Sequence, residues 1–329
     1  MRWILMSGNV TGIPLVSVYC MTYNQVHTIA QTIEGILDQK TDFPFELIIH
    51  DDASTDGTAE IVREYAARYP SIIHPIFQEK NQFHTCNLIK TYIHPVSKGK
   101  YIALCEGDDY WTDSAKLQLQ VDHMESDSSC TLCFHAVQQL SPDGNMMNYR
   151  PLKSACEVPA ELIIKRGGLF CPTVSLMFRR DVMDTWPDFR EQADVYDYPA
   201  QILAAVMGRV HYIDRFMAVY RFASQGSWTA QHTNDADYTH VKNETHWLEL
   251  FNTYTENKYK DAVNYHMAHM WLTEYRKAND PVARDTAQMY IKQLRFKDRL
   301  MFRTLLVIFS VMGRRANALW QTLKKHILK

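Results

Sequence analysis

Residues 101–111 read YIALCEGDDYW, an apolar segment that runs directly into three carboxylates. Residues 101–105 carry no charge and favour a buried strand, whereas Glu106, Asp108 and Asp109 follow at once. Crowded carboxylates repel one another, so such a cluster is best stabilised by a cation, and Mg²⁺ or Mn²⁺ selects oxygen ligands. Open α/β sheets bind their ligands at the carboxyl ends of strands. The stretch therefore predicts a metal site, with an acidic turn before a helix as the structural alternative.

The segments before this stretch alternate apolar strands with amphipathic helices. Because helices separate successive strands, we expect an α/β fold with a doubly wound, mostly parallel, Rossmann-like sheet. The second strand ends in Asp51 and Asp52, so one crevice can receive these aspartates and the later acidic cluster. The later chain predicts a strand over 170–180, a helix over 198–207 and two short strands over 209–222. The expected strands of the first part are 15–22, 45–52, 72–77 and 101–105, and its expected helices are 25–40, 58–69 and 88–96.

Composition and cysteine usage describe an ordered globular protein of 329 residues with 46% hydrophobic residues. Seven cysteines argue against a disulfide framework and are typical of a reducing cytoplasm. Cys130 and Cys133 form a CxxC, but no second pair stands at zinc spacing, so we expect buried core cysteines. The apolar run at residues 3–6 is too short for a signal peptide, and the run at 305–312 is too short to cross a bilayer.

Several segments together resemble an inverting nucleotide-sugar glycosyltransferase of family 2, with the GT-A fold. The resemblance covers residues 14–228. The chain would then divide into a short extension at 1–13, the GT-A domain, a helical extension at 229–290 and a basic tail at 291–329. The segments that carry the resemblance are PLVSVYCMTYN (14–24), FELIIHDDASTDGT (45–58), GKYIALCEGDDYW (99–111), and DYP (197–199) followed by VYR (219–221).

The resemblance implies a donor site at the first two strand ends. In such enzymes the turn at Thr22, Tyr23 and Asn24 lines the base and ribose of the donor. The aspartate at the position of Asp52, beside Asp51, accepts hydrogen bonds from the base, and a carboxylate suits the N–H of uracil or guanine. The structural alternative for the two aspartates is a pair that caps the turn before the next helix.

The acidic cluster corresponds to the DxD motif of this family. Asp108 would be the direct metal ligand, and the ion, Mn²⁺ or Mg²⁺, would bridge the two phosphates and stabilise the leaving group. Glu106 replaces the first Asp, so a contact through water or with the ribose is as well supported as a direct one. Asp109 would support the loop or the sugar.

Asp197 stands where the family has its catalytic base. An inverting transfer is an in-line displacement, so a base opposite the diphosphate must take the proton of the acceptor hydroxyl. The helix N-terminus and Pro199 would hold this carboxylate ionised and aimed. The alternatives are that Asp197 only caps the helix, or that Asp194 is the base.

Further residues near these motifs have a functional and a structural interpretation. Arg221 would contact the diphosphate, and Ala223 stands where many relatives have His. Trp228 would close a loop over the site or stack on a sugar, with core packing as the alternative. Three residues face either the acceptor or the protein interior: His135, Thr173 and Ser175.

The carboxyl-terminal tail is basic, whereas the rest of the chain is acidic. Residues 292–329 contain ten Lys or Arg and one Asp. Between Ala316 and Ile327 the apolar side chains share one helical face. Such a helix either lies on an anionic membrane or packs against the main domain or a second subunit. Nucleic acid is not an expected partner, because the body is acidic.

The sequence thus predicts a metal-dependent glycosyltransferase in the cytoplasm, either free there or peripheral at the inner face of the membrane. The donor is a nucleotide diphosphate sugar, and the acceptor is a hydroxyl of a glycan or lipid-linked glycan. Two rivals remain. A sugar nucleotidyltransferase needs a Gly- and Lys/Arg-rich first turn, which TYNQVHT (22–28) does not offer. A catalytically silent nucleotide- or glycan-binding module is compatible with the departures at Glu106 and Ala223.

Overall fold

The computed structural model describes residues 12–83, 85–222 and 238–312. The chain forms two compact units. The larger takes in the described residues up to 163 together with 168–186 and 195–222, and the smaller is 164–167, 187–194 and 238–312. The domain boundaries that the sequence suggests stay predictions.

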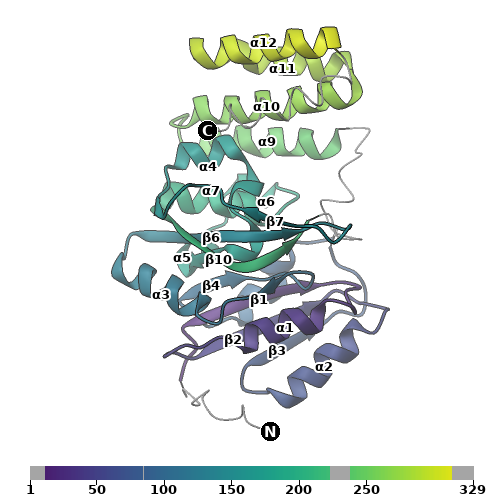
Figure 1. The fold of residues 1–329 in the computed structure, drawn as a ribbon, viewed down its shortest axis with the longest axis vertical. Coiled ribbons are helices and arrows are strands. Elements are labelled where there is room, and N and C mark those ends of the chain that lie inside the picture. Colours follow the sequence, from purple (N-terminus) through teal and green to yellow (C-terminus); the bar gives the residue numbers. More distant parts are fainter. Residues whose placement is uncertain (1–11, 84, 223–237, 313–329) are drawn as a thin grey trace. The chain divides into compact units, whose positions relative to one another are not determined.

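Four parallel strands form the amino-terminal half of a single sheet in the larger unit (Figure 1). Their order is β3-β2-β1-β4, and β1 pairs in parallel with both β2 and β4. Continuous apolar runs are typical of strands covered on both faces, and nearly every residue of β1 and β4 is buried. The predicted parallel arrangement is therefore confirmed here for β1 (Val16–Thr22), β2 (Phe45–Asp51), β3 (Ile73–Phe77) and β4 (Tyr101–Leu104).

The second half of the sheet is mixed. β9 runs antiparallel between β4 and β6, and β10 then pairs in parallel with β6. Two predictions are wrong in this half. Only Met177–Arg179 of residues 170–180 is a strand, and residues 209–221 form one long bulged strand in place of two. The strands are β5 (Tyr110–Trp111), β6 (Cys130–Leu140), β7 (Met146–Tyr149), β8 (Cys156–Glu157), β9 (Met177–Arg179) and β10 (Arg209–Arg221).

The helices of this part bury the apolar faces that the sequence predicts. Ile29, Ile33 and Ile36 of α1 are fully buried. The segment expected as a helix over 88–96 is a π-helical turn followed by a 3₁₀ turn, η1 (Ile89–Ile93) and η2 (His94–Val96). The helices up to residue 207 are α1 (Ile29–Leu37), α2 (Thr58–Arg68), α3 (Lys116–Ser126), α4 (Ala160–Arg166), α5 (Arg180–Asp184), α6 (Asp188–Glu191) and α7 (Asp197–Met207), and two further 3₁₀ turns are η3 (Gly168–Phe170) and η4 (Thr173–Ser175). Of these, α6 and the last residues of α4 belong to the smaller unit.

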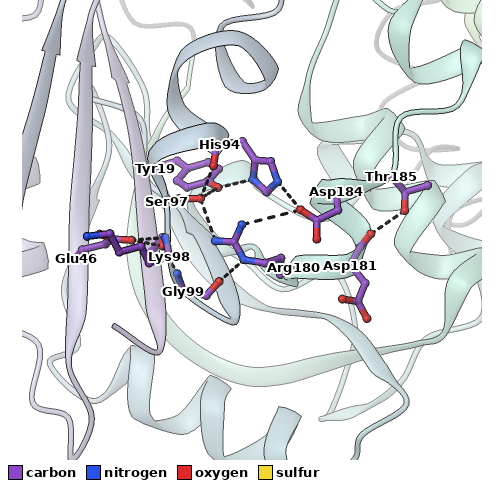
Figure 2. A network of polar contacts seen from close by, with 11 residues as sticks. Tyr19, Glu46, His94, Ser97, Lys98, Gly99, Arg180, Asp181, Asp184 and Thr185 are labelled. Carbon is purple, nitrogen blue, oxygen red and sulfur yellow. Dashed lines mark hydrogen bonds and ion pairs between the residues drawn. The ribbon is translucent and has the colours of Figure 1, made fainter. Parts of the chain in front are cut away.

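A polar network fixes the segment that leads into β4 (Figure 2). The hydroxyl of Tyr19, on β1, hydrogen-bonds with His94 Nδ1 and with Ser97 Oγ, each at 2.7 Å. His94 Nε2 lies 2.6 Å from Asp184 Oδ1, and the Arg180 guanidinium donates to Ser97 Oγ at 3.0 Å. These contacts join β1, η2 and α5 at a fixed start point for β4, the strand that carries the acidic loop.

The smaller unit is helical. Its main elements are α9 (Thr239–Tyr254), α10 (Lys260–Ala278), α11 (Pro281–Gln293) and α12 (Phe296–Met312). Asp280 caps α11, since its side chain accepts from the N–H groups of Val282 and Ala283 at 2.7 and 3.1 Å. Among the described residues, no helix combines the length and apolarity that crossing a bilayer requires.

Candidate active site

The acidic loop between β4 and β5 gathers three carboxylates in one place. Glu106, Asp108 and Asp109 each offer an oxygen, and these oxygens lie within 4.8 Å of one another. Asp109 is fully buried, and the other two are partly buried. The predicted convergence of these three carboxylates at a strand end is therefore present in the fold.

Helix α1 holds this loop from one side through two threonines. Thr28 Oγ1 donates to the Gly107 carbonyl at 2.8 Å, and Thr32 Oγ1 donates to the Asp109 carbonyl at 2.6 Å. On the other side the loop lies close to the end of β1, because a Cβ at Gly107 would stand 2.7 Å from Thr22 Oγ1. The sequence analysis did not identify these threonines as site residues. Polar residues four apart on the buried face of a helix were the available signal.

Two of the three carboxyl groups, Glu106 and Asp109, have raised pKa values. Burial, and then the charges of Asp108 and Asp197, raise the pKa of Glu106 to about 8. Burial and Asp108 also hold the pKa of Asp109 well above its usual range, against the lowering effect of the Arg221 N–H. Asp109 Oδ2 is buried and has no hydrogen-bond partner among the described residues. A desolvated carboxylate of this kind is stabilised by a nearby cation, so the donor set fits a divalent metal with oxygen ligands.

Arg221, the last residue of β10, contacts the acidic loop through its main chain and its side chain. Its main-chain N–H donates to Asp109 Oδ1 at 2.7 Å, and its guanidinium donates to the Asp108 carbonyl. The guanidinium also donates to Gln31 Oε1 at 2.5 Å and lies over the Tyr110 ring. Arg221 therefore stands beside the carboxylates, and in this conformation its guanidinium is engaged by the loop itself.

The two aspartates at the end of β2 are buried and serve different contacts. Asp51 Oδ1 accepts from the Ser54 N–H at 3.1 Å. The Asp52 carboxylate accepts from the N–H groups of Gln82 and Phe83 at 2.8 and 3.1 Å. Asp52 thus holds the loop after β3, a partner that its position in the sequence did not disclose.

The first strand–helix turn lies beside these aspartates. Asn24 has a left-handed φ of 52°, and its Oδ1 accepts from the Thr55 N–H at 2.8 Å. It therefore braces the β2–α2 turn and does not cap α1. Thr22 is buried and donates to Gln25 Oε1 at 2.7 Å, whereas Tyr23 is 48% exposed. Tyr23 and Asn24 are the exposed residues of this turn, and Tyr23 offers an aromatic ring to a ligand.

Asp197 begins α7 in the same unit as the acidic loop. Its Oδ2 accepts from Thr173 Oγ1 at 2.6 Å, and its Oδ1 accepts from the Tyr198 N–H at 2.7 Å. Its charge acts on Glu106, as the raised pKa of that carboxyl reflects, so Asp197 lies within electrostatic reach of the cluster. The larger unit therefore contains both a crowded acidic loop and a separate carboxylate that accepts hydrogen bonds from Thr173 and Tyr198.

The other residues that the sequence analysis considered have structural contacts or lie outside the described residues. His135 is fully buried, with Nδ1 2.8 Å from the Ala136 carbonyl, and Ser175 donates to the Pro172 carbonyl at 2.6 Å. Asp194 belongs to the smaller unit and accepts from His240 Nδ1 at 2.9 Å. Trp228 and the tail at 316–327 lie outside the described residues.

Comparisons with known proteins agree on one family. Residues 17–186 match the model of glycosyl transferase family 2. An uncharacterized protein of Mycobacterium tuberculosis is 35% identical over 219 residues, which are 66% of this chain and 62% of that protein. The chain therefore spans less than two thirds of that relative. A Bacillus subtilis protein, TuaG, named as a glycosyltransferase of teichuronic acid biosynthesis, is 30% identical over 55% of this chain and 69% of its own.

Solved structures share the fold at low identity. TarS of S. aureus in complex with UDP-GlcNAc superposes with a TM-score of 0.66 at 14% identity, covering 92% of this chain and 90% of that one. The mannosyltransferase PcManGT of Pyrobaculum calidifontis, in complex with GDP-Man and Mn²⁺, has a TM-score of 0.51 at 18% identity, covering 92% and 88%. At these identities the likeness concerns the fold, which is an α/β fold of the GT-A type.

Proposed function

The chain belongs to glycosyl transferase family 2, and on this premise we propose that it is a metal-dependent, inverting glycosyltransferase. It moves a sugar from a nucleotide diphosphate sugar to a hydroxyl of a glycan or lipid-linked glycan. One observation carries the proposal: three carboxylates converge within 4.8 Å in the loop after β4, and a fourth, Asp197, acts electrostatically on one of them.

The acidic loop would hold Mn²⁺ or Mg²⁺. Asp108 is the proposed direct ligand, and Asp109 supports the loop through its contact with the Arg221 N–H. When bound, the ion supplies charge stabilisation to the departing diphosphate. Glu106 stands beside them, and its high proton affinity lets it bond a donor hydroxyl or a water ligand as either acceptor or donor.

Asp197 is the proposed catalytic base. Hydrogen bonds from Thr173 and from the Tyr198 N–H fix the plane of its carboxylate and favour the ionised form. The base takes the hydroxyl proton as the acceptor oxygen attacks the anomeric carbon from the side opposite to the diphosphate.

The donor nucleotide would lie across the ends of β1 and β2. Tyr23 and Asn24 form the exposed turn. Asp51 and Asp52 provide the buried carboxylates that would accept hydrogen bonds from the base. Arg221 is the proposed diphosphate ligand. This role requires its guanidinium to leave the Asp108 carbonyl or to contact phosphate with its remaining donors.

Relatives suggest the kind of acceptor. One Escherichia coli protein is 34% identical over 34% of this chain and 42% of its own. It is named a UDP-Glc:α-D-GlcNAc-diphosphoundecaprenol β-1,3-glucosyltransferase. TuaG is named for teichuronic acid biosynthesis. We therefore propose a lipid-linked glycan as acceptor, with the chain at the cytoplasmic leaflet and the basic tail at 316–327 on the membrane.

A donor panel tests the proposal. UDP-, GDP- and dTDP-sugars are offered with Mn²⁺, with Mg²⁺ or with chelator, and release of the nucleoside diphosphate is measured beside thermal stabilisation by the same nucleotides. At least one donor should release its diphosphate only with metal. Stabilisation by a nucleotide without release from any donor, even with undecaprenyl diphosphate-linked acceptors, would instead indicate a silent binding module.

A further inference from the structure

Helix α12, in the smaller unit, exposes large apolar side chains. Phe296 is 80% exposed, Leu300 57% and Val307 62%. At about 100° of helical rotation per residue, these three lie within an arc of about 40°. Isolated exposed apolar residues are common, but a row of them on one helical face is a feature of interaction surfaces. We name Phe296, Leu300 and Val307 the α12 ridge.

The opposite face of α12 is apolar and buried, so the helix does not expose the α12 ridge in place of a buried face. Phe302, Leu305 and Phe309 are buried, and the rings of Phe302 and Tyr265 meet edge to face at 5.0 Å. The helix therefore has two apolar faces. One is satisfied by α10 and α11, which pack against it (Figure 1), and the other faces away from them.

Basic side chains flank the α12 ridge, and the acidic residue of α12 lies on another face of the helix. Arg303 and Lys297, both exposed, stand on its two sides at helical spacing. Asp298 is the one acidic residue in the sequence of this helix. It lies on the buried side, where its Oδ2 is 3.9 Å from Lys165 Nζ. An apolar strip between basic side chains is the pattern of a helix that lies in a membrane interface.

From this arrangement we infer that the α12 ridge docks the protein on a bilayer that contains anionic phospholipid. Phe296, Leu300 and Val307 enter the acyl boundary, while Lys297 and Arg303 meet the phosphate groups. The chain beyond residue 312 adds five Lys or Arg and no acidic residue, so the charge of the surface continues along the sequence.

Charge complementarity selects the membrane over a second copy of the chain. In a symmetric dimer the same patch faces itself, so Arg303 and Lys297 of each copy would approach those of the other. Like charges across an interface disfavour association, whereas a layer of anionic headgroups neutralises them. This inference deepens the membrane location that belongs to the proposed function, because it assigns membrane contact to named residues of α12, and vesicle binding is measured without donor or metal.

Cosedimentation of the full-length protein with vesicles tests the inference. Wild-type protein should bind vesicles of phosphatidylcholine with phosphatidylglycerol, and bind vesicles of phosphatidylcholine alone far more weakly. The variant Phe296→Ser/Leu300→Ser/Val307→Ser should lose at least about tenfold in partitioning, because three large apolar groups no longer enter the lipid. Lys297→Glu/Arg303→Glu should lose binding selectively at low salt.

A matched control uses exposed apolar residues of the neighbouring helix. Val282 and Met289 on α11 are 58% and 47% exposed, and Val282→Ser/Met289→Ser should bind vesicles like the wild type. Circular dichroism should show equal melting temperatures for all variants, since the ridge is already solvated.

Four results would overturn the inference. In the first, wild-type protein stays in the supernatant, and in the second, the ridge variant binds vesicles as well as the wild type. In the third, the ridge variant melts several degrees lower, because the ridge is covered within the chain. In the fourth, the ridge substitutions dissociate a dimer while vesicle binding persists. Each differs from a failure of the proposed function, which would appear as absent diphosphate release by a protein that still binds vesicles.

Discussion

Asp109 Oδ1 accepts the main-chain N–H of Arg221 at 2.7 Å, which joins the acidic loop to the far end of β10. The two residues are 112 positions apart in sequence. Asp109 is fully buried, and its second carboxylate oxygen has no hydrogen-bond partner among the described residues. One oxygen of this carboxylate therefore fixes the loop geometry, whereas the other is buried without a hydrogen bond from the described residues.

Two substitutions at Asp109 should separate these roles. Asp109→Asn keeps an acceptor for the Arg221 N–H, so urea unfolding should change little, while half-maximal activity should need more Mn²⁺ because a negative charge is gone. Asp109→Ala leaves a buried N–H without an acceptor and should cost about 1–3 kcal/mol of unfolding free energy. Equal metal requirements for Asp109→Asn and the wild type would show that this carboxylate only holds the loop.

Gly107→Ala should damage the acidic loop. The added Cβ would stand 2.3 Å from Gln25 Oε1 and 2.7 Å from Thr22 Oγ1, so the loop or β1 must shift. We expect a loss of about 1–3 kcal/mol in stability and a lower kcat. Gly12→Ala is the control, because its nearest neighbour would be 3.8 Å away. If both variants behave alike, the close approach at Gly107 does not constrain the site.

Thr173 should position the base, not react itself. Its hydroxyl donates to Asp197 Oδ2 at 2.6 Å, so Thr173→Val should lower kcat about tenfold and raise the apparent pKa of the basic group in the pH–rate profile, because a hydrogen bond to the ionised form is lost. Thr173→Ser should restore both. Asp197→Ala should lose about a thousandfold or more. A Thr173→Val enzyme with unchanged profile would remove Asp197 from the role of base.

The smaller unit should be most stable in a mildly acidic window. Glu244 accepts from His240 and His266, which outweighs its burial and lowers its pKa from 4.5 to about 2, so its contribution is lost as pH falls below 4.5. At His240, burial lowers the pKa, but the hydrogen bonds to Asp194 and Glu244 outweigh it and raise the pKa from 6.5 to about 9. The contribution of His240 to folding stability is therefore lost as the pH rises above 6.5.

Urea unfolding across this pH range checks the window. The free energy of unfolding should be greatest between pH 4.5 and 6.5. The ionic interactions of His240 should contribute on the order of 3 kcal/mol to it. Glu244→Gln should flatten the profile, whereas Glu60→Gln, an exposed residue on α2, should leave it unchanged. A profile that Glu244→Gln does not alter would contradict this assignment.

The acidic-loop half of the candidate site could be predicted from the sequence, because it depends on a local pattern. A continuous apolar run followed at once by acids specifies both a buried strand and the residues at its end. β2 and β4 end at Asp51 and Leu104, each within one residue of the predicted end. The parallel pairing of the first four strands follows from the helices between them.

The second half of the fold depends on contacts that no local pattern discloses. The polar pair at 214–215 resembles a turn between two short strands. In the structure Asp214 pairs with Arg150 and Arg215 with Asp113, so the strand continues through a bulge there. Likewise, Thr173 reads as part of a strand, yet it lies in a 3₁₀ turn that points its hydroxyl at Asp197.

The central claim is that the acidic loop binds a divalent cation together with a nucleoside diphosphate through Asp108. Isothermal titration of Mn²⁺ into the full-length protein with saturating UDP or GDP tests it most directly. Asp122→Ala, which removes an exposed aspartate on α3, is the matched control. The wild type and Asp122→Ala should bind one Mn²⁺, and Asp108→Ala should lose at least about a hundredfold in affinity. Equal Mn²⁺ affinity in the Asp108→Ala protein would contradict the account.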